Sequence, residues 1–222
     1  MKRLLTIVGL LVAPLGCVAN QGASIVRFMN ARNIQAGDTC TTEADKYRPS
    51  GVLDLSSGGS YLLAMSIESN TTVPNTSVGQ VNYQGAGLND VTFYEIVYSY
   101  DFSDPAIAAK LPKEETLPIY AVFRPQSDPQ SSYILLEGIG PKAISVLQSA
   151  YLGTGNSGTV VSHIKAKVYT SSGADTETNI FRFPITVFSS GYSGVCSGKD
   201  VVITKCGYAG QDRSVCTPPP GS

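Results

Sequence analysis

The chain contains no tryptophan and a single histidine, His163. Without tryptophan it lacks the largest flat ring on which sugar-binding sites stack their ligands. With one histidine it offers little to a serine or cysteine nucleophile, because such a nucleophile normally needs an imidazole base. His163 alternates with Val161 and Lys165 along a strand-like run, on what we expect to be the solvent face. The missing tryptophan argues against a sugar-stacking site, and the lone histidine argues against a hydrolase.

Charged residues are also few, at 15% of the chain, whereas typical globular domains carry roughly a quarter. The formal net charge is -1, and the basic residues form no cluster. Nucleic acids and anionic membrane surfaces attract basic patches. We therefore expect no nucleic acid partner.

The long apolar run of a membrane-spanning helix is missing as well. Residues 4–12 are apolar except for Thr6, and they follow the basic pair Lys2 and Arg3. A bilayer span needs about 20 apolar residues, whereas a basic end followed by a short apolar core is typical of a secretory signal. The sequence therefore predicts export.

The apolar run leads into Pro14-Leu15-Gly16-Cys17, which resembles the lipobox of bacterial lipoproteins. The resemblance implies that residues 1–16 are a lipoprotein signal peptide and that residues 17–23 are the lipidated Cys17 with a short tether. Several acyl chains on one cysteine give a lasting anchor, because each buried methylene contributes about 0.8 kcal/mol. We expect a lipoprotein of the bacterial outer membrane, on its periplasmic or its surface side. The alternative is an ordinary signal peptide cleaved after Ala19, which would remove Cys17.

Apart from Cys17, an even number of cysteines remains, which favours disulfides in an oxidising compartment. These are Cys40, Cys196, Cys206 and Cys216. Residues 200–204 resemble an extended strand that would hold Cys196 and Cys206 apart, whereas glycines suit a turn between Cys206 and Cys216. We favour Cys206 with Cys216 and, by elimination, Cys40 with Cys196. A zinc site is the alternative, but it needs close cysteine pairs or histidines, so no metal is expected.

Short runs rich in Val, Ile, Tyr, Phe and Thr have apolar residues at every second position, a pattern typical of strands. They are residues 24–29, 51–55, 61–67, 89–102, 116–123, 132–137, 160–169 and 180–188. We predict a hairpin of residues 51–55 with 61–67 around a Gly/Ser turn, and a central strand at 89–102. Strict alternation places Phe93 and Glu95 on one face of that strand.

Residues 141–152 depart from this pattern. Ile144, Leu147 and Tyr151 fall at helical spacing, and Pro141 suits a first helical position, so we predict a short helix between two strands. Many short strands with one helix predict a mainly β fold, an antiparallel β-sandwich of residues 24–195. Residues 196–222 are expected to form a cysteine-containing, disulfide-tied C-terminal extension.

The stretch Gly153-Thr154-Gly155-Asn156-Ser157-Gly158 matches the three-glycine pattern of dinucleotide-binding proteins. That motif needs a strand before it and a helix after it, so that the pyrophosphate meets a helix N-terminus. Here the predicted helix comes first and a β-branched run follows. We interpret the stretch as a loop and expect no cofactor.

Carboxylates could serve a glycoside hydrolase or hold Ca²⁺. The candidate pairs are Asp101 with Asp104, and Glu114 with Glu115. The first pair flanks a turn at Pro105, where aspartate typically caps the backbone. The second pair lies in a charged cluster that we expect to be solvated. We therefore predict no catalytic residue.

Several stretches of the chain recur together in one known group of proteins. They are Tyr47-x-x-x-Gly51-x-Leu53-Asp54-Leu55, Tyr61-Leu62-Leu63 with Asn70, Gly140-Pro141 with Ala143 and Leu147, Phe183-Pro184-Ile185-Thr186-Val187, and Gly210-Gln211-Asp212 with Cys216. In these motifs the chain resembles uncharacterised lipoproteins common in myxobacteria, although Ser190 and Tyr192 stand where additional cysteines are expected. The resemblance implies an envelope location and disulfides, and it implies no activity.

Three functions remain open: a structural or protein-interaction module of the envelope, a small-ligand or glycan-binding module, and a hydrolase. The first is favoured, because a catalytic base, a metal cluster and tryptophan are missing. Its expected partners are the membrane, through the lipid anchor, and another envelope protein. An interaction module should expose an apolar patch or an open strand edge, whereas a ligand-binding module should show tyrosines and convergent polar groups around a hollow.

Overall fold

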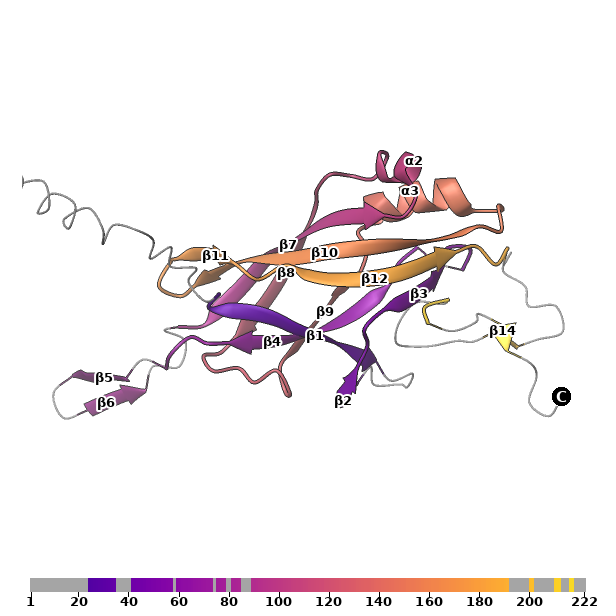
Figure 1. Cartoon of the computed structure of the whole chain (residues 1–222). Coiled ribbons are helices and arrows are strands. Elements are labelled where there is room, and N and C mark those ends of the chain that lie inside the picture. Colours follow the sequence, from indigo (N-terminus) through magenta and orange to yellow (C-terminus); the bar gives the residue numbers. More distant parts are fainter. Residues whose placement is uncertain are drawn as a thin grey trace, which may run out of the picture.

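The computed structural model describes residues 24–34, 41–57, 59–73, 75–78, 81–84, 89–191, 200–201, 210–212 and 216–217. Within them the chain is mainly β, with the two helices α2 (Pro105–Ala108) and α3 (Pro141–Tyr151) (Figure 1). The predicted β-rich class is confirmed. Cys17, Cys40, Cys196 and Cys206 lie outside the described residues, as does the side chain of Cys216, so lipidation and disulfide pairing stay predictions.

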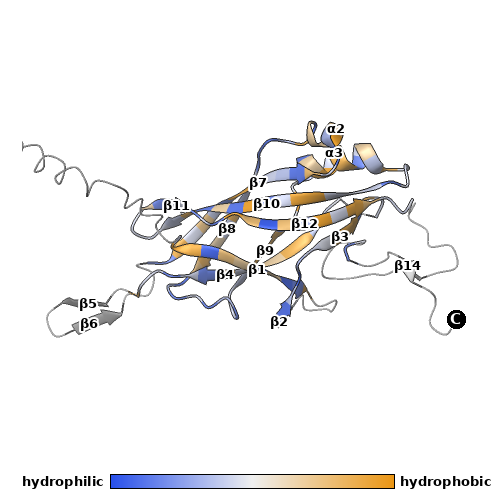
Figure 2. Ribbon diagram, in the orientation of Figure 1, coloured by the Kyte–Doolittle hydropathy of each residue, from blue (hydrophilic) through white to orange (hydrophobic). Residues whose placement is uncertain are grey.

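The larger sheet has the strand order β3-β12-β10-β7-β8, with β11 paired to β10. These strands are β3 (Gly51–Asp54), β12 (Phe181–Phe188), β10 (Ser157–Thr170), β7 (Val91–Phe102), β8 (Glu115–Phe123) and β11 (Asp175–Glu177). The strand predicted at residues 89–102 is central, as expected, because β7 lies between β10 and β8. Polar and apolar residues alternate along β10 (Figure 2).

The smaller sheet has the order β2-β1-β4-β9. Its strands are β2 (Thr42–Tyr47), β1 (Val26–Ile34), β4 (Leu62–Ser69) and β9 (Tyr133–Glu137). Two further antiparallel pairs are β5 (Asn75–Val78) with β6 (Val81–Gln84), and β13 (Asp200–Val201) with β14 (Cys216–Thr217).

Both sheets contribute side chains to one apolar core. Phe28 on β1 and Phe93 on β7 are fully buried, and their ring centroids lie 6.1 Å apart. Helix α3 adds Ile144, Leu147 and Tyr151 to the same core. The helix therefore forms where residues 141–152 predicted it, between β9 and β10, and it buries the predicted stripe.

The predicted hairpin of residues 51–55 with 61–67 is wrong. β3 pairs in parallel with β12 in the larger sheet, whereas β4 pairs with β1 and β9 in the smaller one. Tyr61, which is fully buried between the two strands, packs its ring against Gly51, where a side chain would collide with it. Buried residues on both faces of β4 leave no alternation from which its partner could be read.

The alternation predicted along β7 is also wrong past its midpoint. The register of β7 against β10 shifts between Phe93 and Glu95, where two residue steps in β7 lie opposite the single step from Val168 to Lys167. Phe93 is buried, but beyond the shift Ile96 and Tyr98 face the core and Glu95 does not. An irregularity of this kind adds one residue to a strand and turns every later side chain to the other face.

Part of the predicted C-terminal extension packs on the β domain. The Gln211 amide accepts a hydrogen bond from the backbone N–H of Leu62 at 2.8 Å and donates one to its carbonyl at 2.7 Å. Asp212 accepts from the Val52 N–H at 2.9 Å and the Tyr61 hydroxyl at 2.8 Å. Residues 210–212 therefore hydrogen-bond to the backbone of both β3 and β4.

Candidate functional site

His163 lies on the outer face of β10, as predicted, but its side chain is only 18% exposed. Its Nε2 atom is 3.0 Å from Oδ2 of Asp101 on the adjacent strand β7. Strand pairing thus brings together two candidate residues that were not predicted to meet. Among the described residues, Nε2 has no aligned hydrogen-bond partner.

Glu115 is not solvated, and the prediction that it lies in an exposed charge cluster is wrong. Its side chain is 2% exposed. The carboxylate accepts hydrogen bonds from the N–H groups of Lys142, at 2.8 Å, and Ala143, at 3.3 Å. These are unpaired donors at the N-terminus of α3, which favours negative charge. The adjacent Glu114 is exposed, as predicted.

Two tyrosines, the buried Tyr98 and the half-buried Tyr100, lie beside the Glu115 carboxylate. Burial, and then nearby negative charge that includes Glu115, raises the pKa of Tyr98 far above its ordinary value. Burial also raises the pKa of Tyr100, whose hydroxyl donates to Glu115 at 3.3 Å and accepts from the Gly140 N–H at 2.9 Å. This cluster is interior and joins β7, β8 and α3, so we assign it a structural role.

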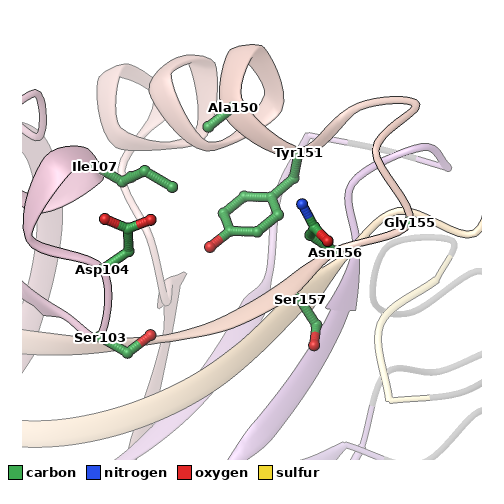
Figure 3. A pocket seen from close by; sticks show the side chains of 8 residues that line it. All are labelled: Ser103, Asp104, Ile107, Ala150, Tyr151, Gly155, Asn156 and Ser157. Carbon is green, nitrogen blue, oxygen red and sulfur yellow. The ribbon is translucent and has the colours of Figure 1, made fainter.

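An open pocket of about 580 Å³ lies between α2, the end of α3 and the start of β10 (Figure 3). Its lining residues are Ser103, Asp104, Ile107, Ala150, Tyr151, Gly155, Asn156 and Ser157. The predicted cap is confirmed, because Asp104 Oδ1 accepts from the Ala106 N–H at 2.8 Å. Asp104 and the glycine-rich stretch, considered separately in the sequence, meet here.

Tyr151 was predicted only as a core residue of the helix, yet its hydroxyl points into this pocket (Figure 3). Gly158 makes this position possible: a Cβ atom there would lie 2.5 Å from the hydroxyl oxygen and 2.6 Å from Phe102. The third glycine of the predicted loop therefore leaves room for the phenol. The helical spacing of Tyr151 predicts a core position, and it does not indicate that the hydroxyl reaches a pocket.

A second surface lies on the outer face of the larger sheet. We call it the tyrosine face, and it consists of Tyr94, Tyr120, Val122 and Tyr169, which are 37%, 79%, 45% and 39% exposed. Val122 on β8 and Tyr169 on β10 both pair with Thr92 on β7, the strand that lies between them. The Tyr94 and Tyr169 ring centroids lie 5.9 Å apart. Tyr94 faces solvent because it follows the buried Phe93 in the alternation of β7.

In the described part of the chain, no group of three or more His, Cys, Asp or Glu side chains is placed to hold a metal ion. Asp101 and Asp104 have separate partners, His163 and the α2 backbone. Neither described helix has the length and apolar character of a membrane span.

Comparison with known proteins gives no relative. The chain matches no protein-family model, and it shows no significant similarity to a curated protein or to a solved structure.

Proposed function

We propose that this chain is an exported envelope lipoprotein, anchored through a lipidated Cys17, whose β domain acts as a structural or protein-interaction module. In this proposal residues 24–195 form a β-sandwich, and the tail after it is tied by disulfides, Cys206 with Cys216 and Cys40 with Cys196. The contact between Phe28 and Phe93, from different sheets, supports the sandwich. The basic start and short apolar run of residues 1–16 support export.

The tyrosine face is the observation that carries the interaction role. Three tyrosines and a valine are held on paired strands with their side chains toward solvent. Tyrosine supplies large contact area and a hydrogen-bonding hydroxyl at low cost in side-chain entropy, and it is enriched in protein interfaces. An exposed group of this kind is the feature expected of an interaction module.

The partner that fits this face is a folded protein surface with apolar and hydrogen-bonding groups. β8 is an edge strand in the described part of the sheet, but Pro118 within it has no N–H to offer an added strand. The edge is therefore poorly suited to strand addition. Beside Tyr94, the side chains of Lys167 and Glu95 form an ion pair of 2.7 Å. The charges next to the tyrosine face therefore neutralise each other.

Site-specific crosslinking in intact cells tests the proposal. A photo-reactive amino acid at position 120 is expected to capture a defined protein, and Tyr169→Ser is expected to weaken that capture. Tyr47, which is 51% exposed on β2 of the other sheet, is the matched control position and should not capture it. Equal capture at positions 47 and 120, or none at 120, would contradict the proposed role of this face.

A further inference from the structure

The pocket between α2 and α3 contains the phenol of a well-packed tyrosine, Tyr151. Tyr151 is 5% exposed. Its ring packs edge-on against Phe102, with centroids 6.0 Å apart, and Gly158 leaves space for its hydroxyl. No described residue forms a hydrogen bond with that hydroxyl, although it points into an open pocket (Figure 3). The hydroxyl is therefore available to form a hydrogen bond with a ligand in the pocket.

The phenol is a hydrogen-bond donor at neutral pH. Burial raises the pKa of Tyr151, and the negative charge of Asp104 raises it further. Tyr151 therefore keeps its proton. Asp104 contributes the complementary acceptor: Oδ1 is occupied by the α2 cap, whereas Oδ2 accepts no hydrogen bond from the described residues.

A hydroxyl group matches this arrangement, because it can accept from the phenol and donate to the carboxylate. The amide of Asn156 and the hydroxyl of Ser157 line the same pocket, and Ile107 and Ala150 offer apolar contact to C–H groups. Asp104 is the sole ionised side chain among the lining residues, so an anionic ligand would meet repulsion without a counter-charge.

We propose that this pocket binds a neutral saccharide, with hydroxyl groups placed between Tyr151 and Asp104. The volume of about 580 Å³ lies in the usual range of small-ligand sites. This site is separate from the tyrosine face and does not depend on the function proposed for that face.

Calorimetric titration of the full-length protein tests the proposal. The protein is kept in an amine-oxide detergent, because a maltoside would itself present sugar. The probes are maltose, cellobiose and N,N′-diacetylchitobiose, with digalacturonate as the anionic counterpart. At least one neutral disaccharide is expected to bind, and digalacturonate is expected to bind more weakly or not at all.

Two conservative variants locate the binding. Tyr151→Phe removes one hydroxyl that has no described partner, so it should leave thermal melting unchanged and weaken binding about tenfold, the value of one good hydrogen bond. Asp104→Asn keeps an oxygen for the α2 cap and should weaken binding by about the same factor.

Asp128 provides the matched control. Its Oδ1 accepts from the Gln130 N–H at 2.8 Å, as Asp104 does from Ala106, but it is not part of the pocket. Asp128→Asn should leave the affinity unchanged. Failure of all three neutral disaccharides to bind, tighter binding of digalacturonate, or unchanged affinity in Tyr151→Phe would each overturn the proposal.

Discussion

The Glu115 carboxylate accepts a hydrogen bond of 2.8 Å from the backbone N–H of Lys142, and so joins the first residue of β8 to the first turn of α3. The residue is buried, and its partners are donors that no helical carbonyl can satisfy. This relationship makes Glu115 a structural anchor of the helix that borders the pocket.

Glu115→Ala is expected to lower the free energy of unfolding by about 2 to 3 kcal/mol, because it leaves buried N–H groups without an acceptor. Glu115→Gln keeps one acceptor oxygen and should cost about 1 kcal/mol. Urea denaturation measures both. Glu114→Ala is the control and should stay within about 0.5 kcal/mol of the unchanged protein. Equal losses at the two positions would show that the Glu115 contacts contribute nothing.

Asp54 is expected to contribute to acid sensitivity. Burial by itself would raise the pKa of this carboxyl, but hydrogen bonds from Ser190 and Ser56 outweigh it and hold the pKa below its ordinary value of 3.8. Because the folded-state pKa is the lower one, the unfolded chain takes up the proton first. The stabilisation is therefore present above pH 3.8 and is lost as the pH falls through the folded-state pKa.

The measurement is the free energy of unfolding between pH 6 and pH 2, roughly the range over which carboxyls titrate. Asp54→Asn should reduce the loss of unfolding free energy at the acid end of this range. Asp175→Asn, at an exposed position on β11, should not. If the two variants follow the same curve, the hydrogen bonds from Ser56 and Ser190 do not set the pKa of Asp54.

The side chain of Gln211 is expected to hold the C-terminal segment on β4. Gln211→Ala leaves the N–H and carbonyl of Leu62 without these hydrogen bonds, which should cost about 1 to 3 kcal/mol in urea denaturation. Gln130→Ala, at an exposed loop position, is the matched control. Protease cleavage within the tail should also become faster in Gln211→Ala. Unchanged stability together with unchanged cleavage would contradict the contact.

Lipidation at Cys17 predicts how the protein partitions. Cys17→Ser should leave an unprocessed or soluble protein that no longer enters the detergent phase, because the acyl chains supply the membrane affinity. Phase separation of labelled cells gives the answer. Cys40→Ser serves as the control for loss of a cysteine and should still enter the detergent phase. Identical partitioning of Cys17→Ser and the unchanged protein would rule out the lipid anchor.

The local features of this chain could be predicted from the sequence, because they depend on the periodicity of neighbouring residues. The stripe of Ile144, Leu147 and Tyr151 predicts α3, and period-two runs predict most of the strands, including the central β7. The Asp104 cap before Pro105 is a similar short-range interaction. In each case the residues that fix the conformation lie within a few positions of one another.

The tertiary structure decided the remaining features, because they depend on contacts between distant residues. Tyr61 and Gly51 pack together while β3 and β4 join different sheets, which no alternation pattern reveals. The register shift in β7 turns Ile96 and Tyr98 toward the core, and the pairing of β7 with β10 brings Asp101 to His163. A periodic sequence shows that a face is buried but not which partner buries it or in which register. The pocket between α2 and α3 likewise exists only because Asp104, Tyr151 and Gly158 meet in space.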